Sequence, residues 1–269
     1  MTPQQLLSHY DCSELWSAAP GMQPGFDMAA AYQSALAVRA LRIARQEVPR
    51  GYKIGFTNRN IWPRYNVFAP VWGTVWNSTL QFCDGEGTVE LSGICQPRIE
   101  PEAVFGLRAT PPINATLQQL FDCLDWVAAG FEIVQSHLPD WKFTAPDAVA
   151  DGGLHARLLV GRKVPVGDVA ACAEALEQQL AAATVSLVHD GKQIEQGQGA
   201  NVLDGPLHAL HYFMQELRNC PNAVDLKAGD VITTGTWTDA WPVSAGQTWS
   251  AQFSAPLSRL DVRFAPPKR

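Results

Sequence analysis

An apolar stretch with two glutamates near its centre constrains the fold more than any other part of the chain. It runs from Gln96 to Phe105 and carries Glu100 and Glu102 on either side of Pro101. Proline disfavours a helix, so the segment is expected to be extended, and side chains two positions apart on a strand point to the same face. The stretch therefore predicts a strand with a carboxylate pair, lying either in a buried site or on the solvated face of an edge strand.

A third glutamate favours the buried site. Glu132 stands alone among Phe, Ile and Val neighbours. Adjacent buried carboxylates repel one another unless one of them takes up a proton or a cation lies between them. Because Mg²⁺ and Mn²⁺ are hard ions that prefer oxygen ligands, we expect Glu100, Glu102 and Glu132 to hold one such ion.

Length and charge limit the class of protein. With 269 residues the chain can bury a sizeable core. We expect residues 1–269 to form a single catalytic domain, with a helical N-terminal portion over 1–50 and a metal-binding, β-rich core over 51–269. The net charge is −6 and the lysines and arginines are scattered, which argues against nucleic acid or an anionic membrane as the main partner.

Cysteine spacing and hydropathy bear on the cellular compartment. The six cysteines include no Cys-x-x-Cys pair, so neither a zinc site nor a disulfide framework is indicated. The first residues lack a basic and then apolar run, and no stretch of ~20 apolar residues occurs. We therefore expect a cytoplasmic protein.

Periodicity and turn signals predict the other elements. Helices are expected at 28–46, where Asp27 is the N-cap, and at 116–129 and 206–217. The dipeptide Asp190-Gly191 predicts a β-hairpin. Many short strands without regular strand and helix alternation predict an α+β fold.

Two segments before the glutamate pair suggest a pocket. A short strand over 52–56 carries Lys53 between Gly51 and Gly55, which let the backbone come close to a ligand. A lysine there is either a functional group or a surface side chain that reaches solvent. The Trp-rich segment from Asn58 to Trp76 predicts a long loop that covers the pocket as a lid.

Five motifs follow one another along most of the chain. They are Gly51 to Thr57, the Glu-Pro-Glu segment, Glu132 to Val134 with Asp140 to Lys142, Gly197 to Leu203, and Leu226 to Thr236. In this order they resemble the 2-hydroxypenta-2,4-dienoate hydratase and 4-oxalocrotonate decarboxylase family of the fumarylacetoacetate hydrolase superfamily.

The resemblance implies a fold, a reaction and a set of site residues. The fold would be a mixed β-roll with peripheral helices, and the protein a homo-oligomer. The activity would be that of a Mg²⁺- or Mn²⁺-dependent lyase that hydrates a 2-hydroxy-2,4-dienoate, a small anionic acid, to a 4-hydroxy-2-oxo acid in aromatic catabolism. The resemblance assigns catalytic roles to Lys53 and Lys142, and substrate contacts to Thr57, Gly235 and Thr236.

The chain departs from the family pattern at one point. The hydratases carry Pro-Asp-Tyr-Gly where this chain has Pro-Val-Trp-Gly, so Val71 stands in place of an acidic residue that could orient water. Asp84, Asp140 and Asp151 are the possible replacements. The departure leaves decarboxylation of an oxalocrotonate-like 2-oxo diacid as the alternative to hydration.

Two further alternatives make different demands on the site. A C–C bond hydrolase of the same superfamily would need a histidine paired with an acid near the metal, and only His137 or His155 could supply it. A non-enzymatic binding protein would not need the three glutamates.

Overall fold

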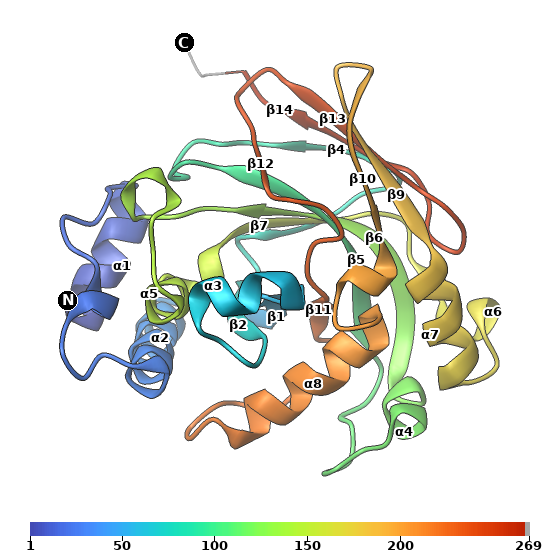
Figure 1. The fold of residues 1–269 in the computed structure, drawn as a ribbon, viewed down its shortest axis with the longest axis horizontal. Helices are drawn as coiled ribbons and strands as arrows, with labels where there is room; N and C mark the ends of the chain where they lie inside the picture. Colours follow the sequence, from blue (N-terminus) through green and yellow to red (C-terminus); the bar gives the residue numbers. More distant parts are fainter. Residues whose placement is uncertain (267–269) are drawn as a thin grey trace.

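Two curled β-sheets carry the core of the protein, and helices surround them (Figure 1). The computed structural model describes residues 1–266. The larger sheet has nine strands in the order β2-β1-β11-β5-β6-β7-β3, with β12 paired to β5 and β8 paired to β6. Its strands are β1 (Pro49–Gly55), β2 (Val71–Trp76), β3 (Leu80–Phe82), β5 (Arg98–Leu107), β6 (Leu124–Val134), β7 (His155–Val160), β8 (Val164–Pro165), β11 (Val231–Thr233) and β12 (Trp241–Pro242).

The smaller sheet packs across the larger one. It has five strands in the order β10-β9-β13-β14-β4. Its strands are β4 (Glu86–Val89), β9 (Thr184–His189), β10 (Lys192–Gln198), β13 (Thr248–Phe253) and β14 (Leu260–Phe264). The strands β9 and β10 form the hairpin predicted at Asp190-Gly191.

Helices cover the outside of the sheets. They are α1 (Pro3–Cys12), α2 (Met28–Ala44), α3 (Trp62–Tyr65), α4 (Leu117–Phe121), α5 (Ala145–Ala150), α6 (Val166–Val169), α7 (Ala173–Ala182) and α8 (Pro206–Asn219). The predicted helices at 28–46 and 206–217 are confirmed as α2 and α8, and Asp27 caps α2 by accepting a hydrogen bond from the Ala30 amide. None of the helices in the described part of the chain is long and apolar enough to cross a membrane.

The helix predicted at 116–129 is wrong beyond its first turns. Thr116 caps α4 as expected, but the helix ends at Phe121 and β6 begins at Leu124. The strand pairs with β5 on one side and β7 on the other, and all its residues except Asp125 are buried. A strand buried on both faces is apolar at every position, so it matches helical spacing as readily as strand spacing.

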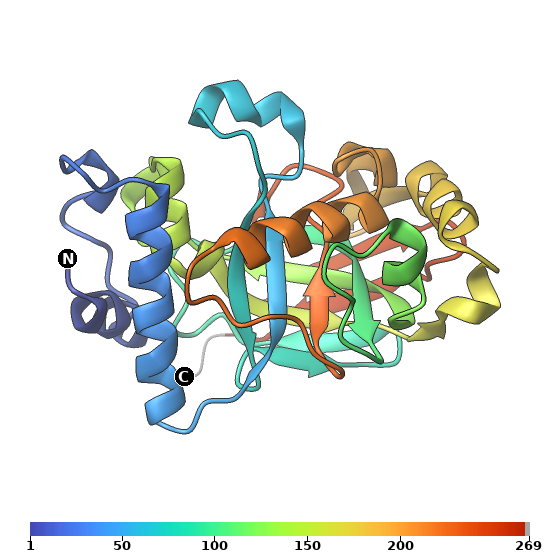
Figure 2. The same ribbon diagram turned by 90° about the horizontal axis from the view of Figure 1, so that it is seen from below.

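The segment predicted as one long loop is divided. Residues 71–76 form β2, while 59–65 form a short 3₁₀ turn and α3. This arm, residues 58–66, stands out from the body of the molecule in Figure 2.

The central strand β5 is interrupted on one edge. On one side it pairs with β6 along its whole length, but on the other β12 covers only Arg98 and Ile99, and β11 begins at Val104. The gap lies at 100–103, where Pro101 has no amide hydrogen to offer a neighbouring strand. An interior strand can therefore hold a proline here, and the Pro101 carbonyl accepts a hydrogen bond from the Trp237 amide (3.0 Å).

Candidate metal centre and substrate pocket

Adjacent strands bring the three predicted glutamates together. Glu100 lies directly opposite Glu132 in the β5–β6 pairing, and Glu102 follows on the same face of β5. One carboxylate oxygen from each glutamate lies within 4.8 Å of those of the other two. Glu102 and Glu132 are fully buried and β5 is an interior strand, which excludes the solvated edge strand considered from the sequence.

Each of the two buried carboxylates uses one oxygen in hydrogen bonds to other protein groups. Glu102 Oε2 accepts hydrogen bonds from the amides of Thr234 (3.0 Å) and Gly235 (2.7 Å). Glu132 Oε1 lies 2.9 Å from Nδ1 of His155. The other oxygens, Glu102 Oε1 and Glu132 Oε2, are buried without a hydrogen-bond partner. Such oxygens are expected to be satisfied by a ligand or an ion.

Burial also disfavours the charged form of these groups. It raises the pKa of Glu132 to about 8, because the lowering effect of Lys53 does not offset burial and the repulsion of Glu100. Burial, with repulsion from Glu132 and Glu100, raises the pKa of Glu102 well above its ordinary value. A divalent cation would remove this repulsion, so the donor set fits Mg²⁺ or Mn²⁺.

Lys53 is the cation that the protein itself supplies. Its side chain is 3% exposed, which excludes the surface-lysine alternative, and Nζ lies 3.3 Å from Glu132 Oε2. Burial alone would lower the pKa of Lys53, but Glu132, Glu100 and Glu102 together raise it above its ordinary value. Lys53 is therefore positively charged beside the glutamates at neutral pH.

Glu100 and Lys53, which adjoin the other two glutamates, line a pocket of about 210 Å³. Glu100, Lys53, Thr57 and Thr236 line it, together with an aromatic wall and two arginines. The aromatic residues are Phe56, Tyr65, Trp141 and Phe143, and the arginines are Arg64 and Arg98.

The residues predicted to contact substrate lie at this pocket. Gly235 has φ +94°, and a Cβ there would lie 1.9 Å from Thr57 Oγ1, so only glycine fits. The close approach holds Thr57 against the turn that supplies the amides for Glu102. Thr236 follows this turn and lines the pocket, with its hydroxyl donating to the Thr238 carbonyl (3.0 Å).

Lys142 lies away from the site, so the structure does not bring it together with the other predicted residues. Its side chain is 80% exposed and Nζ lies 3.2 Å from the Asp140 carboxylate. Asp140 and Trp141 both have positive φ. The resulting turn directs Trp141 and Phe143 into the pocket and Lys142 into solvent.

His155 was one of the two histidines considered for the metal site, whereas the sequence had suggested no place there for Arg98. His155 bridges Glu132 and the Thr79 hydroxyl, 2.8 Å from Nε2, and burial lowers its pKa well below the ordinary value. It therefore orients Glu132 as a neutral imidazole. In the sequence, Arg98 stands two positions before Glu100, and this spacing places both side chains on one face of the strand.

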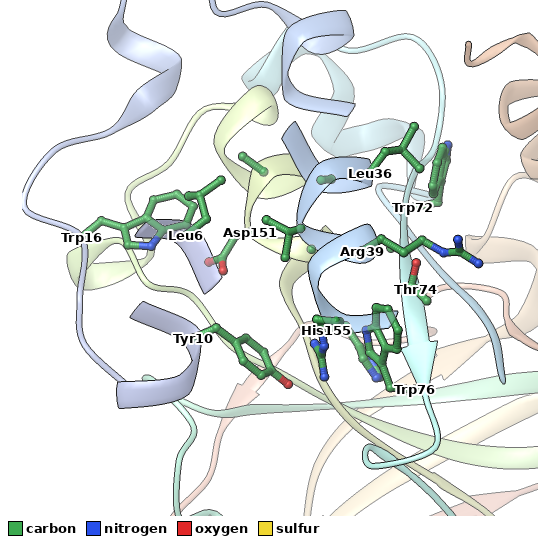
Figure 3. Close-up of a pocket in the computed structure, with 16 residues that line it drawn as sticks. Leu6, Tyr10, Trp16, Leu36, Arg39, Trp72, Thr74, Trp76, Asp151 and His155 are labelled. Carbon is green, nitrogen blue, oxygen red and sulfur yellow. The ribbon is translucent and has the colours of Figure 1, made fainter. Parts of the chain in front are cut away.

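The other histidine considered from the sequence, His137, contacts two residues that line a different cavity. His137 Nδ1 lies 2.5 Å from the Asp151 carboxylate, and its ring stacks on Trp16. Asp151 and Trp16 line a smaller cavity of about 60 Å³ between α1, α2 and β2 (Figure 3). Neither His137 nor His155 is among the residues within 1–266 that line the metal pocket, but His155 pairs with Glu132, so one of the two histidines considered for a C–C hydrolase does lie beside an acid of the metal site.

Solved structures of other proteins share this fold. A 4-oxalocrotonate decarboxylase from Pseudomonas putida, solved with magnesium and adipate, matches with a TM-score of 0.87 at 23% identity, covering 97% of this chain and 95% of that one. A fumarylpyruvate hydrolase from Pseudomonas aeruginosa, solved with Mn²⁺ and pyruvate, has a TM-score of 0.62 at 16% identity, over 82% and 91% of the two chains. The predicted α+β fold with a mixed β-roll and peripheral helices is confirmed.

Sequence comparison finds relatives over most of the chain. A 2-hydroxyhexa-2,4-dienoate hydratase from Comamonas testosteroni is 29% identical over 218 residues, 80% of this chain and 78% of the relative. A 2-keto-4-pentenoate hydratase from Burkholderia vietnamiensis is 29% identical over 85% and 83% of the two chains, and a 4-oxalocrotonate decarboxylase from Pseudomonas sp. is 28% identical over 77% and 75%.

The resemblance seen in the motifs is thereby confirmed. Over most of its length the chain is similar to the hydratases and decarboxylases of the 2-hydroxypenta-2,4-dienoate hydratase and 4-oxalocrotonate decarboxylase family. These relatives are named as enzymes, as expected for this chain. No protein-family model matches the sequence.

Proposed function

We propose that this protein is a divalent-metal-dependent lyase that hydrates a 2-hydroxy-2,4-dienoate to a 4-hydroxy-2-oxo acid in aromatic catabolism. The observation that carries the proposal is the cluster of three glutamates, in which the buried oxygens Glu102 Oε1 and Glu132 Oε2 have no hydrogen-bond partner. Lys53 forms an ion pair with Glu132 Oε2, and Lys53 and Glu100 line the pocket. The names of the similar hydratases support the choice of reaction.

Glu100, Glu102 and Glu132 would hold the ion. When bound, Mg²⁺ or Mn²⁺ supplies Lewis-acid polarisation of the oxygen at C2 of the substrate. The two buried carboxylates are already oriented by Gly235 and His155, so binding the ion requires no rearrangement of these contacts.

The chain's own residues would bind the acid and move a proton. Lys53 Nζ, charged and buried in the pocket, can donate a proton to the substrate or stabilise negative charge that develops on it. The hydroxyl of Thr57 can donate a hydrogen bond to the substrate carboxylate, and the hydroxyl of Thr236 can do so in place of its hydrogen bond to the Thr238 carbonyl. The aromatic wall excludes bulk water, which strengthens each of these interactions.

Decarboxylation of an oxalocrotonate-like 2-oxo diacid is the second candidate, and a specific observation favours it. None of Asp84, Asp140 and Asp151 lines the pocket. Apart from Glu100, the one carboxylate in the described lining is Asp239, which is exposed. The pocket thus offers no buried spare carboxylate to orient water, and decarboxylation does not need one.

Turnover of a small panel of acids tests the proposal. The purified protein with Mg²⁺ would be offered 2-hydroxypenta-2,4-dienoate and an oxalocrotonate-like diacid, followed by ultraviolet absorbance and carbon dioxide release. We expect metal-dependent loss of the dienol absorbance, absent in Glu102→Gln. Turnover that persists in a chelator would overturn the proposal, and carbon dioxide release without hydration would replace the first candidate by the second.

The setting of the enzyme is part of the same proposal. We propose a single catalytic domain in a cytoplasmic homo-oligomer that acts on a small acid and uses neither nucleic acid nor a membrane as partner. All six cysteines are free thiols, in keeping with a reducing compartment.

A further inference from the structure

We propose that the smaller cavity, between α1, α2 and β2, is a second binding site, and that it takes a small aliphatic carboxylate. The proposed lyase reaction does not use this cavity, so the inference stands independently of that reaction. Two features point to such a ligand. Buried N–H groups of the lining have no acceptor within residues 1–266, and one arginine of the lining has no acidic partner there.

The cavity forms where short side chains of a helix meet large rings. Ala35 and Val38 of α2 line it together with the indoles of Trp16, Trp72 and Trp76. The short side chains leave a space of about 60 Å³ between the helix and the rings (Figure 3). One buried water needs roughly 10–15 Å³ of such space, so the cavity has room for a ligand of about five non-hydrogen atoms.

Three N–H groups of the lining lack an acceptor. Trp16 Nε1, Trp72 Nε1 and Arg39 Nε are buried without a hydrogen-bond partner in the described part of the chain. Both tryptophan side chains are only 3% exposed. Buried N–H groups are normally paired, so a surplus of them favours a ligand that carries acceptor oxygens.

Arg39 also carries a charge that the protein does not neutralise. The other arginine of the described lining, Arg42, forms an ion pair with Glu47 at 2.5 Å, and its guanidinium lies over the rings of Tyr10 and Trp76. No acid among residues 1–266 forms an ion pair with Arg39. The cavity therefore offers one free positive charge.

Asp151, the acidic group of the described lining, does not compensate this charge. Both its oxygens are used by His137, because Oδ1 lies 2.5 Å from Nδ1 and Oδ2 accepts a hydrogen bond from the amide at 2.8 Å. In Figure 3 Asp151 lies towards Trp16, on the side of the cavity away from Arg39. A carboxylate bound at Arg39 would thus be separated from that of Asp151.

The surroundings of Arg39 suit a ligand with one charged and one apolar end. In Figure 3 its side chain extends between Trp72 and Thr74, and the Thr74 hydroxyl has no hydrogen bond in the described structure. A planar guanidinium binds a carboxylate through two parallel hydrogen bonds. Ala35 and Leu36 offer apolar surface for a short alkyl chain. These groups select a small aliphatic carboxylate.

The cavity and the metal pocket share a wall. Gly152 and His155 line the cavity, whereas Gly153 and Leu154 line the metal pocket. His155 Nδ1 lies 2.9 Å from Glu132 Oε1, so an occupant of the cavity would lie against the segment that orients a proposed metal ligand. Because the two sites are neighbours, the test must show which of them the acid enters.

A matched pair of small molecules tests the proposal. Calorimetry on the full-length protein with Mg²⁺ would compare propionate with propionamide, which has the same shape without the charge. We expect propionate to bind at a dissociation constant of about 1 mM or below, about tenfold more tightly than the amide. Arg39→Gln should remove this preference. Ala35→Leu fills the cavity and should abolish the binding of both molecules.

A control and a structure locate the ligand. Arg162→Gln removes an exposed arginine outside both sites and should leave the two affinities unchanged. A crystal soaked in propionate should show the carboxylate at Arg39. Equal affinities for propionate and propionamide, no detectable binding, water alone in the cavity, or propionate binding that persists in both Arg39→Gln and Ala35→Leu would each overturn the proposal. The comparison of the two molecules uses the unmodified protein, so a misfolded variant does not prevent a decision.

Discussion

Glu102 and Glu132 divide their oxygens between the protein and the pocket. One oxygen of each is held by Gly235 or His155, and the other has no hydrogen-bond partner. A buried carboxylate with one unmet oxygen is costly unless the environment provides a cation. The contacts that fix the first oxygen therefore position the second for an ion. Burial of these carboxylates destabilises the metal-free site, and binding of an ion would remove this destabilisation.

The first prediction concerns metal affinity. Glu102→Gln keeps an acceptor for the amides of Thr234 and Gly235 but removes the negative charge. We expect calorimetry to show Mg²⁺ and Mn²⁺ affinity reduced by about tenfold or more, ~1.4 kcal/mol. Without metal the variant should be no less stable than the unmodified protein, because a buried charge has been removed.

A matched variant controls for the loss of charge itself. Glu86→Gln changes an exposed glutamate at the start of β4 and should leave metal affinity unchanged. If Glu102→Gln binds Mg²⁺ as tightly as the unmodified protein, these three glutamates are not the metal site.

The second prediction concerns Val71. This buried residue pairs with Gly55 in β1, and a Cβ placed on Gly55 would lie 3.8 Å from Val71 Cγ2 and 3.2 Å from Lys53 Nζ. Val71→Asp therefore sets a carboxylate near Lys53, where it can orient water. We expect hydration of 2-hydroxypenta-2,4-dienoate to rise about tenfold, a barrier change of ~1.4 kcal/mol.

The neutral isostere Val71→Asn is the control, because it shares the size and polarity of the change without the charge. Both variants should lose some stability from burial of a polar group. No gain in hydration, together with efficient carbon dioxide release from an oxo-diacid by the unmodified protein, would favour the decarboxylase instead.

At the scale of elements, the arm over 58–66 is the part of the pocket that can move. Tyr65 stacks on Phe143 across the pocket mouth, with ring centroids 5.5 Å apart, and meets Phe56 edge-on at 4.9 Å. Arg59 pairs with Asp204 at 2.7 Å, but both side chains are largely exposed, so this ion pair contributes little. A few aromatic contacts therefore hold the arm, which stands clear of the body in Figure 2.

The third prediction follows from these contacts. Oxalate with Mg²⁺ should hold the arm closed, because a ligand in the pocket adds contacts to Tyr65 and Arg64. We expect tryptic cleavage after Arg59 and Arg64 to slow when both are present. Glu102→Gln should lose this protection under the same conditions. Equal cleavage with and without the ligand would contradict a lid.

Elements differ in how far the sequence could predict them. The strand β5 was predictable because Pro101 excludes a helix and the glutamate spacing marks one face. The strand β6 was not, because burial on both faces removes the alternation that distinguishes a strand from a helix. The helix predicted at 116–129 covers α4 and the first residues of β6, and only its N-cap and the residues of α4 are correct.

The residues of the site also differ in how far the sequence could predict them. The sequence could predict that the three glutamates and Lys53 lie together, because the glutamate spacing and the order of the motifs both indicate it. Lys142 could not be excluded from the sequence, since its direction depends on the positive φ of Asp140 and Trp141, which no local pattern marks. The sequence had named His155 as a histidine for the metal site, but its contact with Glu132 and that of Arg98 with Trp141 join different strands or turns, so these contacts appear only once the fold is known.

At the scale of the whole molecule, the site links stability to pH and metal. The pKa of Glu132 is raised to about 8, and those of Glu100 and Glu102 are raised as well, all chiefly by burial. Such groups keep their protons in the folded protein at pH values where the unfolded chain has lost them. The stability they contribute is complete below the unfolded pKa of about 4.3 and is lost as pH rises towards the folded value.

The fourth prediction is therefore a pH-dependent metal effect on thermal unfolding. Between pH 5 and pH 8, metal-free protein should lose stability relative to Glu102→Gln, which has one buried carboxyl fewer to ionise. Mg²⁺ binds the ionised form, so its increase in Tm should be larger at pH 8 than at pH 6. The comparison with the variant cancels the titration of groups elsewhere, such as Asp151, whose pKa is raised by burial. The contrary result would be parallel curves of Tm against pH for the two proteins, with a Mg²⁺ effect that does not change with pH. The glutamates would then be ionised in the folded protein without an ion, and the electrostatic argument for the metal centre would be wrong.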